Sequence, residues 1–350
     1  MKIFSFLGTL LCASSALAGA STLAGTSPNN QGIVTRQTPN RRTIRVVRRD
    51  ASLPTMHERI IGGTKAPAGK YTFAVRLTII RGTETFLCGG TLIAADTVVT
   101  AAHCMVDEDT NTIAKPEQVY VAYGADATTL QKQVSPANIT VHPKYNPKLV
   151  TNDIAIIQIR PVTLSSTVTT IPVYTGDIPV DMTMTTMGWG KTSNNATSLA
   201  KTLMAVDVKV GQPRTCAQAN PTYRSASGPE VCTVNALTPG KDSCQGDSGS
   251  PSVIEKDGQL YFVALTSVGT DLANSGSSDC ALSDGLAFYT HVNYFMPFIT
   301  SVTGASASTY TNGSSTKDLP SSNGSGNGAV SRLVSMQGCM LAMLVSVLIL

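Results

Sequence analysis

The sequence predicts an all-β domain between residues 60 and 303, folded as an antiparallel barrel or sandwich. Short runs rich in β-branched and aromatic residues recur, separated by Gly, Pro and Asn, and few stretches have helical character. Charged residues form only 14% of the chain, which favours a strand-and-loop extracellular protein over a helical cytosolic one. The clearest expected strands are residues 73–80, 119–123, 154–159 and 260–265.

One late helix is expected over residues 292–302. Pro297 would lie inside it, and an interior proline removes a hydrogen bond and destabilises a helix.

The segments outside this domain have distinct compositions. Residues 1–18 have a basic start, a short apolar run and the small-residue site Ala16-Leu17-Ala18, as in a secretory signal peptide. Residues 19–59 are polar and then basic, with the pairs Arg41-Arg42 and Arg48-Arg49, which is typical of a propeptide or of a solvated linker. Residues 304–328 form a Ser/Gly-rich stalk, and residues 329–350 contain a hydrophobic C-terminal tail.

Charge and cysteine content restrict the class of protein. The net charge of +4 includes a basic stretch before residue 60, and no basic face indicates nucleic acid binding. Cys12 and Cys339 lie in the two terminal apolar runs, which leaves six cysteines in the predicted domain. Behind a secretion signal, an even set of cysteines predicts disulfides, although counting leaves fifteen pairings open.

Three motifs carry chemistry. They are residues 88–104, Cys-Gly-Gly-Thr-Leu-Ile-Ala-Ala-Asp-Thr-Val-Val-Thr-Ala-Ala-His-Cys; residues 152–156, Asn-Asp-Ile-Ala-Ile; and residues 241–251, Lys-Asp-Ser-Cys-Gln-Gly-Asp-Ser-Gly-Ser-Pro. With these motifs the chain closely resembles the trypsin/chymotrypsin family of serine proteases from Arg59 to about Ile299. The order His, Asp, Ser separates this family from subtilisins and α/β-hydrolases. The resemblance implies a double antiparallel β-barrel with a C-terminal helix.

The resemblance assigns a triad of His103, Asp153 and Ser248. A serine hydroxyl needs a nearby base, and imidazole has a suitable pKa. Asp153 would hold the tautomer of His103 and stabilise the imidazolium that forms. The oxyanion donors implied are the N–H groups of Gly246 and Ser248.

The primary specificity pocket is also implied by resemblance. Asp242 would form its floor and pair with a substrate Arg or Lys, because an unpaired buried carboxylate disfavours apolar substrates. Ser267 and Gly269 would line the pocket and pair with the substrate backbone. Here the chain departs from its relatives: Val268 replaces a tryptophan, ten residues separate Gly269 from Cys280, and Ala287 falls where trypsins carry glycine. These changes leave subsite preference and the balance between Arg and Lys open.

Residues 59–63, Arg-Ile-Ile-Gly-Gly, resemble the activation site of the family. Cleavage after Arg59 would free the amino group of Ile60, which would pair with Asp247 and order the pocket. The alternative is an N-terminal strand that is never cleaved.

Position in the family implies the disulfides Cys88–Cys104, Cys216–Cys232 and Cys244–Cys280. We expect no cofactor and no bound metal. The stretch 121–133, where vertebrate trypsins hold calcium, offers only the carboxylate of Asp126.

Modification signals are frequent in this chain. Asn138, Asn195, Asn312 and Asn323 lie in N-glycosylation sequons. Asn327-Gly328-Ala329, a polar spacer and the apolar residues 339–350 fit a glycosylphosphatidylinositol (GPI) attachment signal at Asn327, with Ser325 and Asn323 as rival positions. A tail that is trimmed or packed on the barrel is the alternative.

Together these patterns predict a secreted or GPI-anchored serine endopeptidase that cleaves after Arg or Lys and is made as a zymogen. Its expected partners are protein or peptide substrates, an activating protease and protein protease inhibitors, with no nucleic acid. Two other functions stay open: a catalytically inactive homologue acting as a binding or inhibitory module, and a protease of chymotrypsin-like or narrower specificity.

Overall fold

The computed structural model describes residues 60–312 except residue 274. By internal contacts the chain divides into residues 1–41 and 42–350, and the described residues all belong to the second unit. The predicted signal peptide, Arg59, the GPI signal with Asn327 and the sequon at Asn323 lie outside them.

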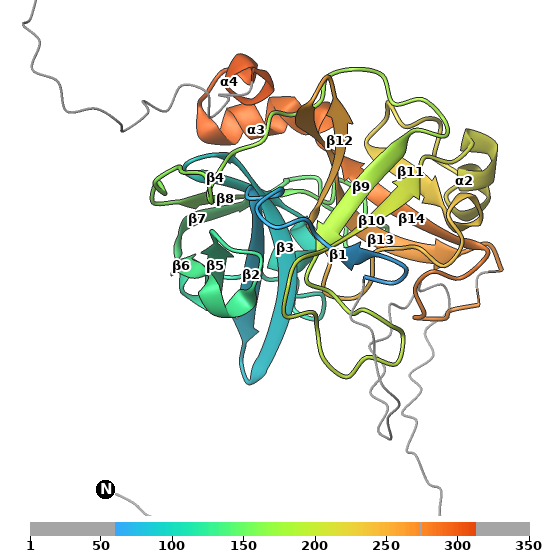
Figure 1. Cartoon of the computed structure of the whole chain (residues 1–350), viewed down its shortest axis with the longest axis horizontal. Helices are drawn as coiled ribbons and strands as arrows, with labels where there is room; N and C mark the ends of the chain where they lie inside the picture. The colour runs from blue at the N-terminus through green and yellow to red at the C-terminus, as the bar shows by residue number, and fades with distance from the viewer. Residues whose placement is uncertain (1–59, 274, 313–350) are drawn as a thin grey trace, which may run out of the picture. The chain divides into compact units, whose positions relative to one another are not determined.

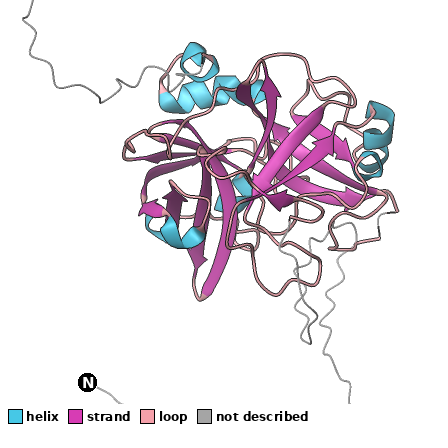
Figure 2. Ribbon diagram, in the orientation of Figure 1, coloured by secondary structure: helices cyan, strands magenta, loops and turns pink. Residues whose placement is uncertain are grey.

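Two seven-stranded antiparallel sheets make up the domain, so the predicted all-β fold is confirmed (Figures 1 and 2). The first sheet has the order β6-β5-β2-β3-β4-β8-β7: Lys132–Val134, Val119–Tyr123, Ala74–Arg81, Glu84–Ala94, Thr97–Thr100, Ala155–Ile159 and Pro136–Val141. The second has the order β1-β10-β9-β12-β13-β14-β11: Thr64–Lys65, Met204–Lys209, Thr183–Gly188, Pro251–Lys256, Gln259–Asp271, Gly285–His291 and Glu230–Val234.

Burial alternates along β2, as expected for a strand with one face toward the core, whereas β4 and β14 are buried at every position. In β2, Val75, Leu77 and Ile79 are fully buried, whereas Thr78 between them is only partly buried. The inward side chains of the first sheet join the core with Phe298 and Ile299 from the C-terminal helix and Phe295 from the turn before it. The second sheet has its own core around Tyr289 and Val263.

The C-terminal helix differs from its prediction in one physical detail. A 3₁₀ turn, η4 (Asn293–Phe295), precedes the helix α3 (Met296–Thr303), so Pro297 occupies the first turn. An N–H is not needed there, and the expected loss of stability does not arise. None of the helices in residues 60–312 is long and apolar enough to cross a membrane.

The packed part of the chain extends further than residue 303. The sequence predicts a stalk from residue 304 onward, but the short helix α4 (Ala307–Thr311) follows α3. Tyr310 is 2% exposed, and its carbonyl accepts the N–H of Val173 at 2.8 Å. The start of the predicted stalk is therefore corrected to beyond this helix.

Three short helical turns lie near the second sheet and the site. They are α1 (Ala102–Met105), α2 (Pro213–Ala219) and η3 (Asn235–Leu237). The structure also has η1 (Pro116–Gln118) and η2 (Thr128–Leu130) beside the first sheet. All three disulfides implied by the resemblance are formed: Cys88–Cys104, Cys216–Cys232 and Cys244–Cys280.

Candidate active site

His103 lies in α1, immediately after the buried strand β4. The disulfide Cys88–Cys104 ties this turn to β3 and so fixes the position of the imidazole. The His103 side chain is 20% exposed, which leaves one edge of the ring accessible.

Asp153 is presented by a tight turn that precedes β8. Asn152 has a positive φ of 53°, and the N–H of Ile154 donates to the Asn152 carbonyl at 2.9 Å. The Asn152 side chain holds the turn by donating to the Lys144 carbonyl at 2.9 Å. Asparagine is among the residues that tolerate this left-handed conformation best.

Asp153 and His103 form a buried pair. Nδ1 of His103 lies 2.8 Å from Oδ2 of Asp153, and the His103 backbone N–H donates to Oδ1 at 2.9 Å. A carboxylate can only accept, so Nδ1 carries the proton in this contact and Nε2 is the nitrogen available as a base. The structure thus brings together two of the predicted triad residues in the required orientation.

Ser267 is a further partner of Asp153. The β13–β14 ladder shifts register between Thr266 and Val268, and at this bulge the Ser267 hydroxyl donates to Oδ2 of Asp153. Thr290 also donates to the Asp153 carbonyl at 2.8 Å. The sequence placed Ser267 only in the substrate pocket, and the motifs contain no signal for this second contact.

The pKa shifts of His103 and Asp153 favour a role of His103 as a base. Burial lowers the pKa of His103, but the charge and hydrogen bond of Asp153 outweigh burial and raise it above its ordinary value. Burial raises the pKa of Asp153, but His103 and Ser267 outweigh it and hold that pKa below its usual range. Asp153 therefore stays ionised beside an imidazole that can accept a proton.

Ser248 is fixed by its backbone between two glycines in the left-handed region. Gly246 has φ 97° and Gly249 φ 75°. The Ser248 carbonyl accepts the N–H of Gly89 at 2.7 Å and lies 3.7 Å from Sγ of Cys104, so Ser248 adjoins the His103 turn. No hydrogen bond joins the Ser248 hydroxyl to His103 within the described residues; such bonds often tighten only when substrate binds.

Two backbone donors are free beside Ser248. The N–H groups of Gly246 and Ser248 reach no acceptor among residues 60–312. The N–H of Lys191 donates to the Gln245 carbonyl at 2.8 Å, and in a trans peptide this turns the Gly246 N–H to the opposite side. This arrangement can stabilise an oxyanion.

Comparison with known proteins agrees with this geometry. The profile of the family described as Trypsin matches residues 60–299. The chain belongs to the trypsin family. It is 30% identical over 250 residues to brachyurin of Leptuca pugilator, and the match covers 70% of this chain and 99% of that protein. It is 32% identical over 226 residues to trypsin alpha-4 of Lucilia cuprina, and the match covers 64% of this chain and 84% of that protein.

A third relative is longer than this chain's matched region. Transmembrane protease serine 11C of Mus musculus is 29% identical over 250 residues, covering 70% of this chain and 54% of the relative. At the level of the family, the chain is a trypsin-like serine protease with a trypsin-like fold.

Asp242, the predicted floor of the primary pocket, lies six residues before Ser248 and is buried. Asp242 is 5% exposed, and burial raises the pKa of its carboxyl despite donors that lower it. Among residues 60–312, no lysine or arginine forms an ion pair with it. Gly269 leaves open space, since an added Cβ would approach only the Leu286 carbonyl, at 3.9 Å.

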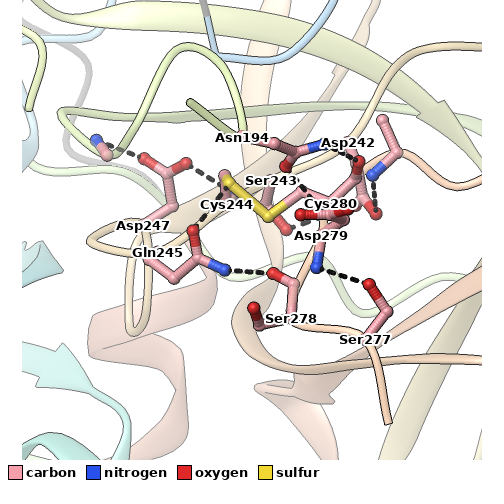
Figure 3. Close-up of a disulfide and its surroundings, with 12 residues drawn as sticks. Asn194, Asp242, Ser243, Cys244, Gln245, Asp247, Ser277, Ser278, Asp279 and Cys280 are labelled. Atoms are coloured by element: carbon pink, nitrogen blue, oxygen red, sulfur yellow. Dashed lines mark hydrogen bonds between the residues drawn. A yellow bond between two sulfur atoms is a disulfide. The ribbon is translucent and has the colours of Figure 1, made fainter. Parts of the chain in front are cut away.

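The side chains of Asn194 and Gln245 hold the long segment that leads from Gly269 to Cys280 (Figure 3). The side chain of Asn194 accepts the Cys280 N–H at 2.8 Å and donates to the Cys280 carbonyl at 3.2 Å. Gln245 donates to the Ser278 carbonyl at 2.6 Å. The sequence revealed the extra length but not these two side chains that hold it.

The residues that follow the predicted cleavage site contact the loop that carries Asp242. Ile60 is fully buried, and the Ile61 carbonyl accepts the Asp242 N–H at 3.2 Å. Asp247 is 1% exposed and accepts the N–H group of Gly190 at 2.7 Å. It also accepts the N–H group of Cys244 at 2.9 Å (Figure 3). Burial raises the pKa of Asp247 to about 7.

Three predicted sequons fall in the described residues, and all three asparagines are exposed. Asn138 lies on β7, Asn195 follows Asn194, which bonds to Cys280, and Asn312 lies directly after α4.

Proposed function

We propose that this trypsin-family protein is an active endopeptidase that cleaves peptide bonds by nucleophilic attack of Ser248. His103 acts as base and then acid, Asp153 orients and stabilises it, and the N–H groups of Gly246 and Ser248 bind the oxyanion. The observation that carries this proposal is the buried Asp153–His103 pair, with Nδ1 and Oδ2 2.8 Å apart, beside two free backbone donors.

Within this proposal, the substrate carries Arg or Lys before the scissile bond. The support is the buried carboxylate of Asp242, which has no cationic partner among residues 60–312 and an open mouth at Gly269. Desolvating such a group is costly until a cation reaches it, so a basic side chain binds better than an apolar one.

Activation by cleavage after Arg59 is part of the same proposal. The new ammonium of Ile60 would neutralise Asp247, whose raised pKa reflects a buried carboxylate without a cation. The fully buried Ile60 side chain supports this arrangement, because it already packs within the core of the second sheet.

The location follows from the segments outside the described residues. We propose that residues 1–18 direct secretion, that the sequons carry glycans, and that residues 329–350 are exchanged for a lipid anchor at Asn327. Phospholipase C specific for phosphatidylinositol, applied to intact expressing cells, should release the protease into the medium. Protein that keeps residues 339–350 after export would exclude the anchor.

One experiment tests the activity and its activation together. The precursor is cleaved after Arg59 and incubated with a peptide library and, separately, with diisopropyl fluorophosphate. We expect label on Ser248 and cuts after Arg and Lys in cleaved protein only, and an Arg59→Gln variant should stay inactive. A cleaved protein that takes no label and cuts nothing would be an inactive homologue.

A further inference from the structure

A buried asparagine amide reaches the floor of the primary pocket. Asn235 begins η3 directly after β11 and is 1% exposed. Its Nδ2 donates to Oδ2 of Asp242 at 3.0 Å and to the Leu282 carbonyl at 3.2 Å. An added Cβ on Gly285 would lie 2.5 Å from Nδ2, so the amide needs a glycine at its side. Asn235 is therefore built into the pocket floor.

The two oxygens of Asp242 differ in how far the protein already occupies them. Oδ2 accepts the Asn235 amide at 3.0 Å and faces the N–H of Ala281 at 3.4 Å. Oδ1 has one side-chain donor, the Ser243 hydroxyl, at the long distance of 3.5 Å. The Ser243 backbone N–H also donates to this carboxylate. Of the two side-chain donors, the Asn235 amide at 3.0 Å is closer than the Ser243 hydroxyl at 3.5 Å, so Oδ2 is the oxygen that the side chains hold more firmly.

This asymmetry bears differently on the two basic side chains. A guanidinium is a planar fork that pairs best when both carboxylate oxygens accept from it in parallel. To form that pair at Asp242, it must compete with the Asn235 amide for Oδ2. A lysine ammonium is a compact charge with three donors, so it can use Oδ1 together with the Ser243 hydroxyl.

The wall of the pocket adds a second, independent constraint. Ala287 pairs with Gly269 in the β13–β14 ladder and lies on the same face of β14 as Tyr289. The Tyr289 hydroxyl is 3.3 Å from the Ser243 hydroxyl, so this face borders the pocket floor. A methyl group at this position leaves less room for the wide, planar guanidinium of arginine than for the compact ammonium of lysine.

We infer that Asn235 is a specificity-determining residue that makes this pocket select lysine over arginine. The inference rests on the proposed function, because it concerns the same pocket. It resolves the balance between Arg and Lys that the sequence motifs leave open.

The test uses protein activated at Arg59 and two peptide p-nitroanilides that differ only in Lys or Arg before the scissile bond. We expect wild-type kcat/KM to favour Lys at least about threefold, and Asn235→Ala to raise the Arg/Lys ratio roughly tenfold, the size of one hydrogen bond to a charged group. Asn220→Ala is the matched control, since Asn220 donates to the Glu230 carboxylate at 2.7 Å beside α2. Its ratio should equal that of the wild type.

A wild type that cuts after Arg faster than after Lys overturns the inference, and so does an Asn235→Ala ratio that matches the control. If Asn235→Ala does not fold, the test is inhibition of the wild type by two matched peptide aldehydes that end in Lys or in Arg. We expect the Lys aldehyde to bind more tightly. Tighter binding of the Arg aldehyde would refute the inference. An activated wild type that cuts after apolar residues and after neither basic residue would instead refute the proposed function itself.

Discussion

Asp247 should make the stability of the uncleaved precursor depend on pH. Its pKa rises from 3.8 to about 7 because it is buried, and its two backbone donors only partly offset that. Between these two values the folded precursor binds more protons than the unfolded chain, so stability falls as pH rises from about 4 to about 7. A shift of about three units corresponds to about 4 kcal/mol.

The assay is urea unfolding at several pH values between 4 and 8. All proteins carry Ser248→Ala to prevent self-digestion, and the Asp247→Asn variant is compared with the precursor. Asparagine cannot ionise, so its cost is a constant offset, while the precursor should lose about 4 kcal/mol more across the window. The informative quantity is therefore the slope with pH and not the absolute stability.

Cleavage after Arg59 supplies the internal control. A free Ile60 ammonium at Asp247 would favour the charged carboxylate and lower its pKa, so the cleaved protein should lose little stability over the same range. A precursor and an Asp247→Asn variant with the same pH slope would refute the reasoning. Equal slopes before and after cleavage would show that the new amino group does not reach Asp247.

Three further predictions concern catalysis and specificity. Ser248→Ala should abolish peptide hydrolysis while thermal unfolding stays unchanged, and near-normal turnover would exclude Ser248 as the nucleophile. Asp153→Asn should lower kcat by roughly 10⁴, as this change does in serine proteases. It should also move the acid limb of the pH–rate profile to lower pH, because the charge that raises the pKa of His103 is lost; an unmoved limb would contradict that role. Asp242→Ser should reduce cleavage after Arg and Lys by orders of magnitude and spare apolar sites; unchanged cleavage would place Asp242 outside the pocket.

Four strands could be predicted from the sequence because strand propensity depends on residues that are adjacent in the chain. The run 119–123 coincides with β5, and the run 154–159 differs from β8 by one residue, since both runs are rich in the β-branched and aromatic side chains that strands favour. Pro297 was harder to place. Composition showed that a helix was present, but its starting residue depends on the 3₁₀ turn that precedes it.

The residues of the candidate site also differ in how far local sequence could predict them. Motif residues such as His103 and Ser248 could be named because their neighbours in sequence are distinctive. Asn235 and Asn194 could not, because each acts on a partner far away in sequence: Leu282 is 47 residues from Asn235, and Cys280 is 86 from Asn194. Only the fold brings these groups together.

Asp242 and Asp247 are two buried carboxylates on the same loop. Burial raises the pKa of both, and within the described residues neither is paired with a lysine or arginine. A buried carboxylate of this kind favours the arrival of a cation, which in the function proposed above comes from the substrate at Asp242 and from the cleaved chain at Asp247. The charge of Asp242 also raises the pKa of Asp247, so the two sites are coupled. A cation that arrives at one site neutralises one carboxylate and so weakens the field that attracts a cation to the other site, and linkage requires this effect to be reciprocal. By electrostatics alone, insertion of the Ile60 ammonium at Asp247 should weaken the binding of a basic ligand at Asp242, so tighter binding after cleavage would have to come from ordering of the pocket.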